Sequence, residues 1–198
     1  MSELFSIQLQ NRQQQGRDGV WLDLPTTTER VQAALRQIGI SSDNPQGLFI
    51  SGYFAEEEKR FAIPYNMVLA SNVDELNFLA SRLETLSTGE RAELNAALQA
   101  PQSELFSIGR ITDFPENVDY YVHLPDVHGP AQLGDYYLNR SGMVDMPEEW
   151  KGGIDTAQFG RYVAQQEQGA FTQYGYLVKS GDEWQKVHEG QPVPEEYR

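Results

Sequence analysis

The sequence contains no cysteine, and basic residues are scarce: 15 Lys and Arg stand against 29 Asp and Glu in 198 residues. Without cysteine the chain has no disulfide and no thiolate chemistry, which fits the cytoplasm. The net charge of −14 repels nucleic acid and anionic membranes, so neither is an expected partner. The same charge attracts basic protein surfaces, including the grooves that normally hold DNA.

Long hydrophobic runs are also missing. No apolar stretch approaches the roughly 18 residues that span a membrane, and the first seven residues do not resemble a signal peptide. Hydrophobic residues make up only 39% of the chain, which predicts thin cores rather than one thick core. Aromatic residues reach 11% and argue against disorder, because each buried ring contributes a large hydrophobic gain.

Motifs of catalysis and metal binding are absent from the sequence. His123, His128 and His188 share no ligand-like spacing, and the glycine-rich stretches fit neither a P-loop nor a dinucleotide fingerprint. Among 29 acids, some pair always falls at the spacing of a glycosidase pair, so such pairs carry no signal. The sequence therefore predicts no catalytic residue, no metal site and no cofactor, and a protein that is not an enzyme.

One short string occurs twice. Residues 2–7 (SELFSI) reappear as residues 103–108, and 20–25 (VWLDLP) are echoed by 120–125 (YYVHLP). All four alternate apolar and polar residues, as half-buried strands do. They indicate either two modules of related plan, each with two strands and a Leu-Pro stop, or a coincidence between two common strand patterns.

Helices are predicted from their caps and spacing. Thr26 and Glu29 suit a capping box, and Gly39 suits the end of that helix. Residues 48–54 follow as a third strand. A second helix is expected from Ser71 or Asn72 to about Leu86, and a third from the capping box at 87–90 to just before Pro101.

The C-terminal third combines another helix with strands. Asp155 is expected to cap the helix. Residues 171–178 and 183–188 are predicted to form a hairpin that turns at 180–182. Residues 190–198, which include two prolines, are expected to be a loose tail.

These elements predict an α+β protein of three small modules in an elongated arrangement. An N-terminal α+β module (1–65) and a C-terminal α+β module (102–198), each with a short antiparallel sheet plus helix, flank a small helical middle module (66–101). The acid surplus lies mainly after the first module. Residues 1–70 have a net charge of −2, whereas residues 71–198 have −12.

The order and spacing of these elements resemble those of the antirestriction ArdA family. The similar parts are the string at 21–25 with the capped helix after it, the strand at 48–53, and the sequence at 154–161 and 175–176. Residues 74–98 resemble the helical middle that holds the family's antirestriction motif. The resemblance covers nearly the whole chain.

The resemblance implies an elongated DNA mimic, made by mobile elements, that inhibits type I restriction–modification enzymes as a homodimer. Its target would be the DNA groove of the methyltransferase core with the specificity subunit. Duplex DNA carries one charge per roughly 1.7 Å, so a net charge of −14 corresponds to about 24 Å, or about seven base pairs. A dimer doubles that length.

Candidate partner-binding acids lie off the apolar stripes of the middle helices and in the base-poor stretch that follows. Any one of them could instead be a solvated side chain or a helix cap, and Glu90 could serve only its capping box. The candidates are Asp74, Glu75, Glu84, Glu90, Glu93, Asp113, Glu116, Asp119, Asp126, Asp135, Asp145, Glu148 and Glu149.

Two other functions fit the same composition. The protein could be an acidic adaptor for another basic partner, such as a nucleoid protein or a conjugation factor. It could also be an enzyme that depends on carboxylates without a recognisable motif. A deep pocket with converging carboxylates would favour the enzyme.

Overall fold

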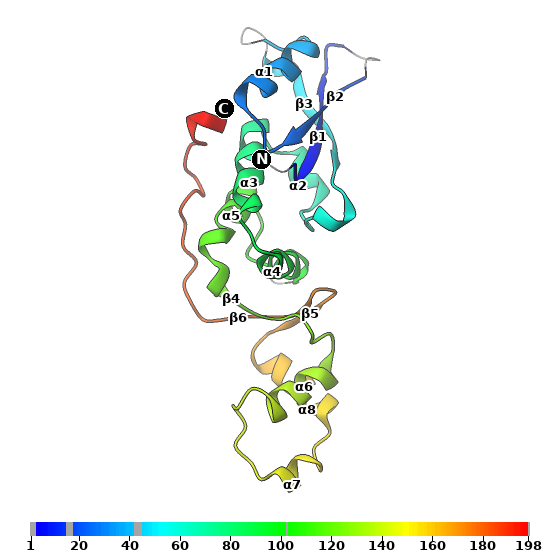
Figure 1. The fold of residues 1–198 in the computed structure, drawn as a ribbon, viewed down its shortest axis with the longest axis vertical. Coiled ribbons are helices and arrows are strands. Elements are labelled where there is room, and N and C mark those ends of the chain that lie inside the picture. The colour runs from blue at the N-terminus through cyan, green and yellow to red at the C-terminus, as the bar shows by residue number, and fades with distance from the viewer. Residues whose placement is uncertain (1–2, 15–17, 42–44, 102, 198) are drawn as a thin grey trace. The chain divides into compact units, whose positions relative to one another are not determined.

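The computed structural model describes residues 3–14, 18–41, 45–101 and 103–197. The chain divides into two compact units. Unit 1 consists of Met1–Ser87, Leu105–Glu116 and Gln185–Arg198, and unit 2 of Thr88–Glu104 and Asn117–Trp184. Both contain helices and a three-stranded antiparallel sheet, which confirms the α+β class (Figure 1). The division into three modules is a different grouping and stays a prediction.

Unit 1 is built on the sheet order β2-β1-β3, in which both pairs are antiparallel. The predicted strands at 48–54 and 20–25 are confirmed, whereas the strand predicted at 2–7 begins at Phe5 and runs on to Asn11. The elements of this unit are β1 (Phe5–Asn11), β2 (Val20–Leu24), α1 (Thr28–Gln37), β3 (Leu48–Phe54), α2 (Tyr65–Leu69), α3 (Val73–Glu84) and α5 (Ile108–Thr112), with short 3-10 turns at Pro45–Gly47, Glu57–Lys59, Phe114–Glu116 and Glu195–Tyr197.

Helix α1 begins one residue later than its caps predicted. The side chain of Thr27, not Thr26, accepts the backbone N–H of Arg30. Thr26 is buried instead, and its backbone exchanges two hydrogen bonds with the buried side chain of Asn77. Gly39 has a φ of 70° and ends the helix, as predicted.

Helix α3 contributes several buried apolar side chains to unit 1. It is capped by Asn72, one of the two predicted starts, whose N–H donates to Glu75 in a capping box. Leu76, Leu79 and Leu83 are fully buried, because positions three and four apart share one face of the helix. The predicted periodicity of this helix is confirmed.

Unit 2 has the sheet order β4-β6-β5, again antiparallel. Its core gathers Leu133 and Tyr176 with half-buried aromatic and aliphatic side chains around them. The elements are α4 (Thr88–Gln99), β4 (Tyr121–Leu124), α6 (Pro130–Asn139), α7 (Glu148–Lys151), α8 (Thr156–Gln166), β5 (Ala170–Thr172) and β6 (Gly175–Lys179), with a 3-10 turn at Val118–Tyr120.

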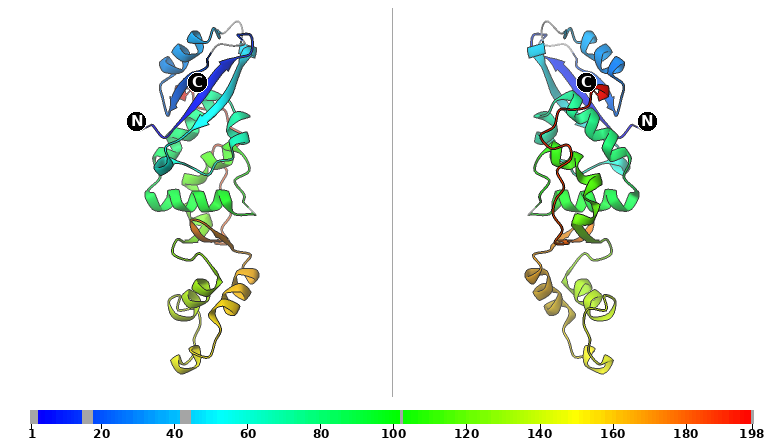
Figure 2. Two further views of the ribbon diagram at one scale, coloured as in Figure 1. Left: turned by 90° about the vertical axis from the view of Figure 1, so that its right-hand side faces the viewer. Right: turned by 90° about the vertical axis from the view of Figure 1, so that its left-hand side faces the viewer.

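Helices α6 and α8 lie side by side (Figure 2). Two glycines allow their backbones to approach closely. A Cβ at Gly134 would collide with the carbonyl oxygen of Thr156, and one at Gly160 with that of Pro130. Because Gly134 meets the start of α8 and Gly160 meets the start of α6, the two helices run antiparallel. The side chain of Asp155 caps α8 by accepting the N–H of Gln158, as predicted. Helix α6 was not predicted, although Pro130 occupies its first turn, where proline is favoured.

The predicted C-terminal hairpin is wrong. Strand β6 pairs with β5 through a two-residue turn, in which the N–H of Tyr174 donates to the hydroxyl of Thr172. Gly175 follows with a φ of 116°, a conformation that side chains rarely adopt. Residues 183–188 form no strand, because the backbone N–H groups of Val187 and His188 donate to a carboxylate of unit 1.

The repeated string SELFSI adopts two different structures. In its first copy, residues 5–7 begin β1, whereas Ser2 lies outside the described residues. In the second copy, Ser107 caps α5 by accepting the N–H of Arg110. The prediction that both copies are strands is therefore wrong, because the residues that follow decide whether Ser107 pairs with a strand or caps a helix.

The last segment of the chain docks on unit 1 and is not a loose tail. We call residues 185–197 the C-terminal segment. The ring of Phe78 contacts those of His188 and Tyr197, each with a centroid separation of 5.0 Å. The hydroxyl of Thr28 donates to the backbone carbonyl of Glu196. These contacts hold the segment against α3 and the start of α1.

Candidate acidic interface

The two units carry their charge in different proportions. Unit 2 contains thirteen acidic and five basic residues, a net charge of −8, whereas unit 1 contains sixteen and ten, a net charge of −6. Net charge alone does not identify an interface, because carboxylates inside a fold serve its stability. The thirteen predicted acids therefore have to be sorted by exposure and by what each carboxylate already binds.

Five of the predicted acids are exposed, and all five belong to unit 2. They are Asp119, Asp126, Asp145, Glu148 and Glu149. Glu148 pairs with Lys151 at 2.6 Å. Among the residues that the structure describes, the other four have no ion pair with a base. Their carboxylates are therefore open to a partner.

The acids of the middle helices are half-buried and sit mainly in first turns. Asp74 and Glu75 lie in the first turn of α3, and Glu90 lies in that of α4. Carboxylates there stabilise a helix through its dipole and its unpaired N–H groups. Glu84, near the end of α3, is also half-buried. Glu75 therefore serves as part of a helix cap. The first-turn position of Glu90 agrees with the alternative that this residue serves only its capping box.

Glu93 is half-buried in α4, and its Oε1 atom has no hydrogen-bond partner within the described part of the chain. Burial raises the pKa of this carboxyl to about 8, with smaller contributions from the negative charges of Glu90 and Asp119. At neutral pH the group is therefore mainly protonated. It adds little negative charge to any surface, so we leave it out of the set available to a partner.

Asp113 is fully buried, with 0% of its surface exposed. Its carboxylate accepts the backbone N–H groups of Val187, His188 and Glu189, at 3.2, 2.6 and 3.1 Å. Charge-assisted hydrogen bonds of this kind offset the cost of burying a carboxylate. Asp113 therefore anchors the C-terminal segment and does not reach a partner. No local pattern in the sequence indicates this contact, because the donors are more than seventy residues away.

Glu116 forms an ion pair with Arg82 of α3. Glu116 also forms a group with Asp113 and His188 whose side chains are of the types that bind metals. Their potential ligand atoms lie within 4.8 Å of one another. The carboxylates of this group already bind Arg82 and three backbone N–H groups. Their arrangement is that of an internal network within unit 1.

Asp135 is half-buried on α6 and has two local partners. It accepts hydrogen bonds from Asn139 and Arg140, each at 2.8 Å. These bonds hold the pKa of the Asp135 carboxyl below its ordinary value, the bond from Asn139 contributing most. Its charge is thus partly compensated within the helix. Three further exposed acids of unit 2 were not among the predicted partner-binding residues: Asp182, Glu183 and Asp155, which caps α8.

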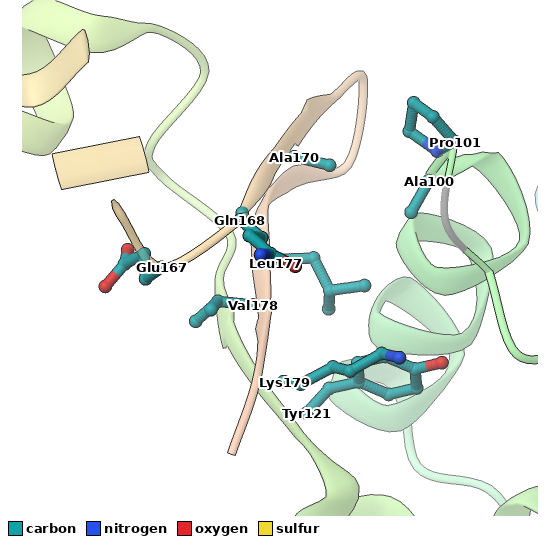
Figure 3. A pocket seen from close by; sticks show the side chains of 10 residues that line it. Ala100, Pro101, Tyr121, Glu167, Gln168, Ala170, Leu177, Val178 and Lys179 are labelled. Atoms are coloured by element: carbon teal, nitrogen blue, oxygen red, sulfur yellow. The ribbon is translucent and has the colours of Figure 1, made fainter. Parts of the chain in front are cut away.

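A hollow of about 210 Å³ in unit 2 lies beside the β4-β6-β5 sheet and the end of α4 (Figure 3). Its lining is largely apolar, with Leu177, Val178 and Pro101. Its ionic groups are engaged: Lys179 pairs with Glu104 at 2.6 Å, and Glu167 accepts hydrogen bonds from the hydroxyls of two tyrosines, Tyr137 and Tyr176. The Glu167 carboxylate also raises the pKa of both phenols, after the larger effect of their burial.

A second hollow, of about 380 Å³, lies in unit 1 against the C-terminal segment. Two carboxylates line it, Glu75 and Glu189. Glu75 accepts the N–H of Asn72, and Glu189 pairs with Arg110 at 3.4 Å. Neither hollow therefore contains a pair of carboxylates that is uncommitted, as an acid–base mechanism would need.

The fold is α+β, and unit 2 carries exposed acidic side chains. No helix in the described part of the chain is long and apolar enough to cross a bilayer. A family model, described as antirestriction protein (ArdA), matches residues 15–178. The chain therefore belongs to the ArdA antirestriction family, whose members act against restriction–modification enzymes, and the predicted resemblance is confirmed. No curated protein matches the chain significantly.

Proposed function

We propose that the protein is a DNA mimic that occupies the DNA-binding groove of type I restriction–modification enzymes, at the methyltransferase core and its specificity subunit. It would act in the cytoplasm, where those enzymes bind DNA. Carboxylates on its surface would stand where DNA phosphates stand. Occupancy of the groove would exclude DNA by competition.

The observation that carries the proposal is the set of acids left available by the fold. Asp119, Asp126, Asp145 and Glu149 are exposed in unit 2 and have no ion pair among the described residues. A groove that binds DNA is densely basic, so these carboxylates complement it. Because the chain belongs to the ArdA antirestriction family, we assign this groove to a restriction–modification enzyme.

The amount of charge supports a homodimer as the active form. A net charge of −8 in unit 2 corresponds to about 14 Å of duplex, at one charge per roughly 1.7 Å. This equals about four base pairs, which is short for a groove that holds an extended DNA site. A second copy would double the length of the mimicked duplex.

In this proposal the protein is an inhibitor without catalytic activity. The carboxylates in the two hollows described above are engaged in capping, ion pairs or hydrogen bonds to tyrosines. This favours binding over turnover. An acidic adaptor would share the same exposed carboxylates, but it would bind its partner without competing with DNA.

The proposal is tested by adding the purified protein to a type I methyltransferase bound to labelled DNA. We expect displacement of the DNA at low salt, and a half-displacing concentration that rises as salt screens the charges. If saturating protein leaves the DNA bound at low salt, the mimic is excluded for that enzyme. Capture of the enzyme together with its DNA would favour the adaptor.

A further inference from the structure

The connection between α6 and α8 is longer than the two helices require. Antiparallel helix neighbours are usually joined by two to eight residues, whereas loops longer than about 12 to 15 residues are uncommon and often functional. Here α6 ends at Asn139 and α8 starts at Thr156. The intervening sixteen residues contain only the four-residue helix α7. We call residues 140–155 the α6–α8 segment.

This segment is folded. The hydroxyl of Ser141 donates to the carbonyl of Tyr137 and accepts the N–H of Met143. Further along, the N–H of Gly153 donates to the carbonyl of Trp150. Three apolar side chains are only half exposed, namely Val144, Met146 and Ile154. The segment therefore holds its other side chains in a defined position, which lowers the entropic cost of binding.

Two large apolar side chains on the segment face solvent. Met143 is 75% exposed and Trp150 is 66% exposed. An indole buries a large apolar area when it can, so its exposure here leaves a gain that only a partner can supply. Trp150 lies in α7 directly after Glu148 and Glu149, and Figure 1 shows α7 in the loop between α6 and α8.

The charges around Trp150 favour a cationic partner. Asp145 and Glu149 are exposed and have no ion pair among the described residues, whereas Lys151 is held by Glu148. The base at the start of the segment, Arg140, pairs with Asp135. An exposed aromatic ring and unpaired carboxylates on the same segment match a guanidinium group and its basic neighbours, because guanidinium stacks on rings and forms hydrogen bonds with carboxylates.

We propose that the α6–α8 segment is a recognition loop in which Trp150 stacks on an arginine side chain of the partner's phosphate-binding surface, while Asp145 and Glu149 pair with neighbouring bases. This inference rests on the proposed function and names the contact that would give the complex its strength. Tryptophan and arginine are the residues that most often dominate binding at an interface. A second copy of this chain is a poorer occupant, because its own acids would repel Asp145 and Glu149.

The test compares Trp150→Ala with Trp21→Ala in the competition against DNA for a type I methyltransferase. Trp21 is a matched control because it is 50% exposed in β2 of unit 1. We expect Trp150→Ala to raise the half-displacing concentration about tenfold, and Trp21→Ala to change it less than about twofold. Trp150→Phe keeps an aromatic face and should recover part of the loss.

The outcomes separate this inference from the proposed function. If the wild-type protein does not displace DNA, the proposed function fails. If the wild type displaces DNA but Trp150→Ala behaves like Trp21→Ala, only the recognition loop is refuted. The loop is also refuted if Trp150→Ala changes the sedimentation of the protein alone, because the segment would then join two copies. Unchanged thermal unfolding of each variant would show that both are folded.

Discussion

The two units share a three-stranded antiparallel sheet, but the predicted candidate acids have different surroundings in each. In unit 1, Asp113 and Glu116 are taken up inside the fold by backbone N–H groups and by Arg82. In unit 2, exposed acids such as Asp126 and Glu149 have no ion pair among the described residues. The comparison shows that burial and existing partners decide which of the predicted carboxylates remain exposed.

The largest effect is expected where unit 2 has no room for a side chain. In Gly160→Ala the new Cβ would collide with the carbonyl oxygen of Pro130 and the backbone N of Gly134. A backbone atom cannot rotate away as a flexible side chain can, so the two helices α6 and α8 as a whole must move apart. We expect a loss of about 3 kcal/mol in the free energy of unfolding, measured by urea denaturation.

Gly89→Ala is the matched control for that substitution. Gly89 lies in α4, and its Cβ would meet nothing within 4 Å. Alanine is the better helix former, so this variant should be slightly more stable, by about 0.5 kcal/mol. Equal stabilities of the two variants would refute the close packing of α6 on α8.

In unit 1 the corresponding weak point is the buried carboxylate of Asp113. Asp113→Asn keeps the size but replaces one acceptor oxygen by an amide that points donors at backbone N–H groups. We expect a loss of about 2 kcal/mol in the free energy of unfolding, because buried donors lose their partner. Hydrogen exchange should accelerate at the amides of Val187, His188 and Glu189.

Asp182→Asn serves as its control, because Asp182 is exposed in unit 2. A surface substitution of this kind should stay within about 0.5 kcal/mol of the wild type. If exchange at residues 187–189 does not change in Asp113→Asn, the carboxylate is not the anchor of the C-terminal segment.

Local signals predicted much of this fold. The periodic apolar positions of α3 and the cap residue Asp155 identified their helices, because those signals act over one or two turns. The second SELFSI string led to a wrong strand prediction, because Ser107 is compatible with either a strand or a helix cap. The docking of the C-terminal segment could not be predicted, because its partner, Asp113, is distant in the sequence.

The candidate acids were predicted as a set, and their individual environments were not. Nothing in the sequence separates the buried Asp113 from the exposed Asp119 six residues later. Burial and hydrogen bonding come from tertiary contacts, which decide which carboxylates keep their charge. Glu93 shows the same limit, because its raised pKa depends on the packing of α4.

A smaller effect is expected at Glu93 in unit 2. Its folded pKa of about 8 lies above the ordinary value, so the folded state binds more protons than the unfolded state between about pH 4.5 and 8. Stability should therefore fall as pH rises through that window. Glu93→Gln removes the titration, and we expect it to exceed the wild type by about 1 kcal/mol at pH 8 but not at pH 5. The two proteins should be compared by urea denaturation at both values, and an equal difference at both would contradict the raised pKa.

The central claim is tested most directly by neutralising acids in one unit at a time. One variant combines Asp119→Asn, Asp126→Asn, Asp145→Asn and Glu149→Gln, and its control neutralises four exposed acids of unit 1, namely Asp18, Glu57, Glu195 and Glu196. Both variants change the net charge equally. The measurement is displacement of labelled DNA from a type I methyltransferase at several salt concentrations. We predict that the unit 2 variant needs about ten times more protein and depends less on salt, whereas the control stays near the wild type. Equal losses in the two variants would contradict the account, because inhibition would then follow net charge and not the exposed acids of unit 2.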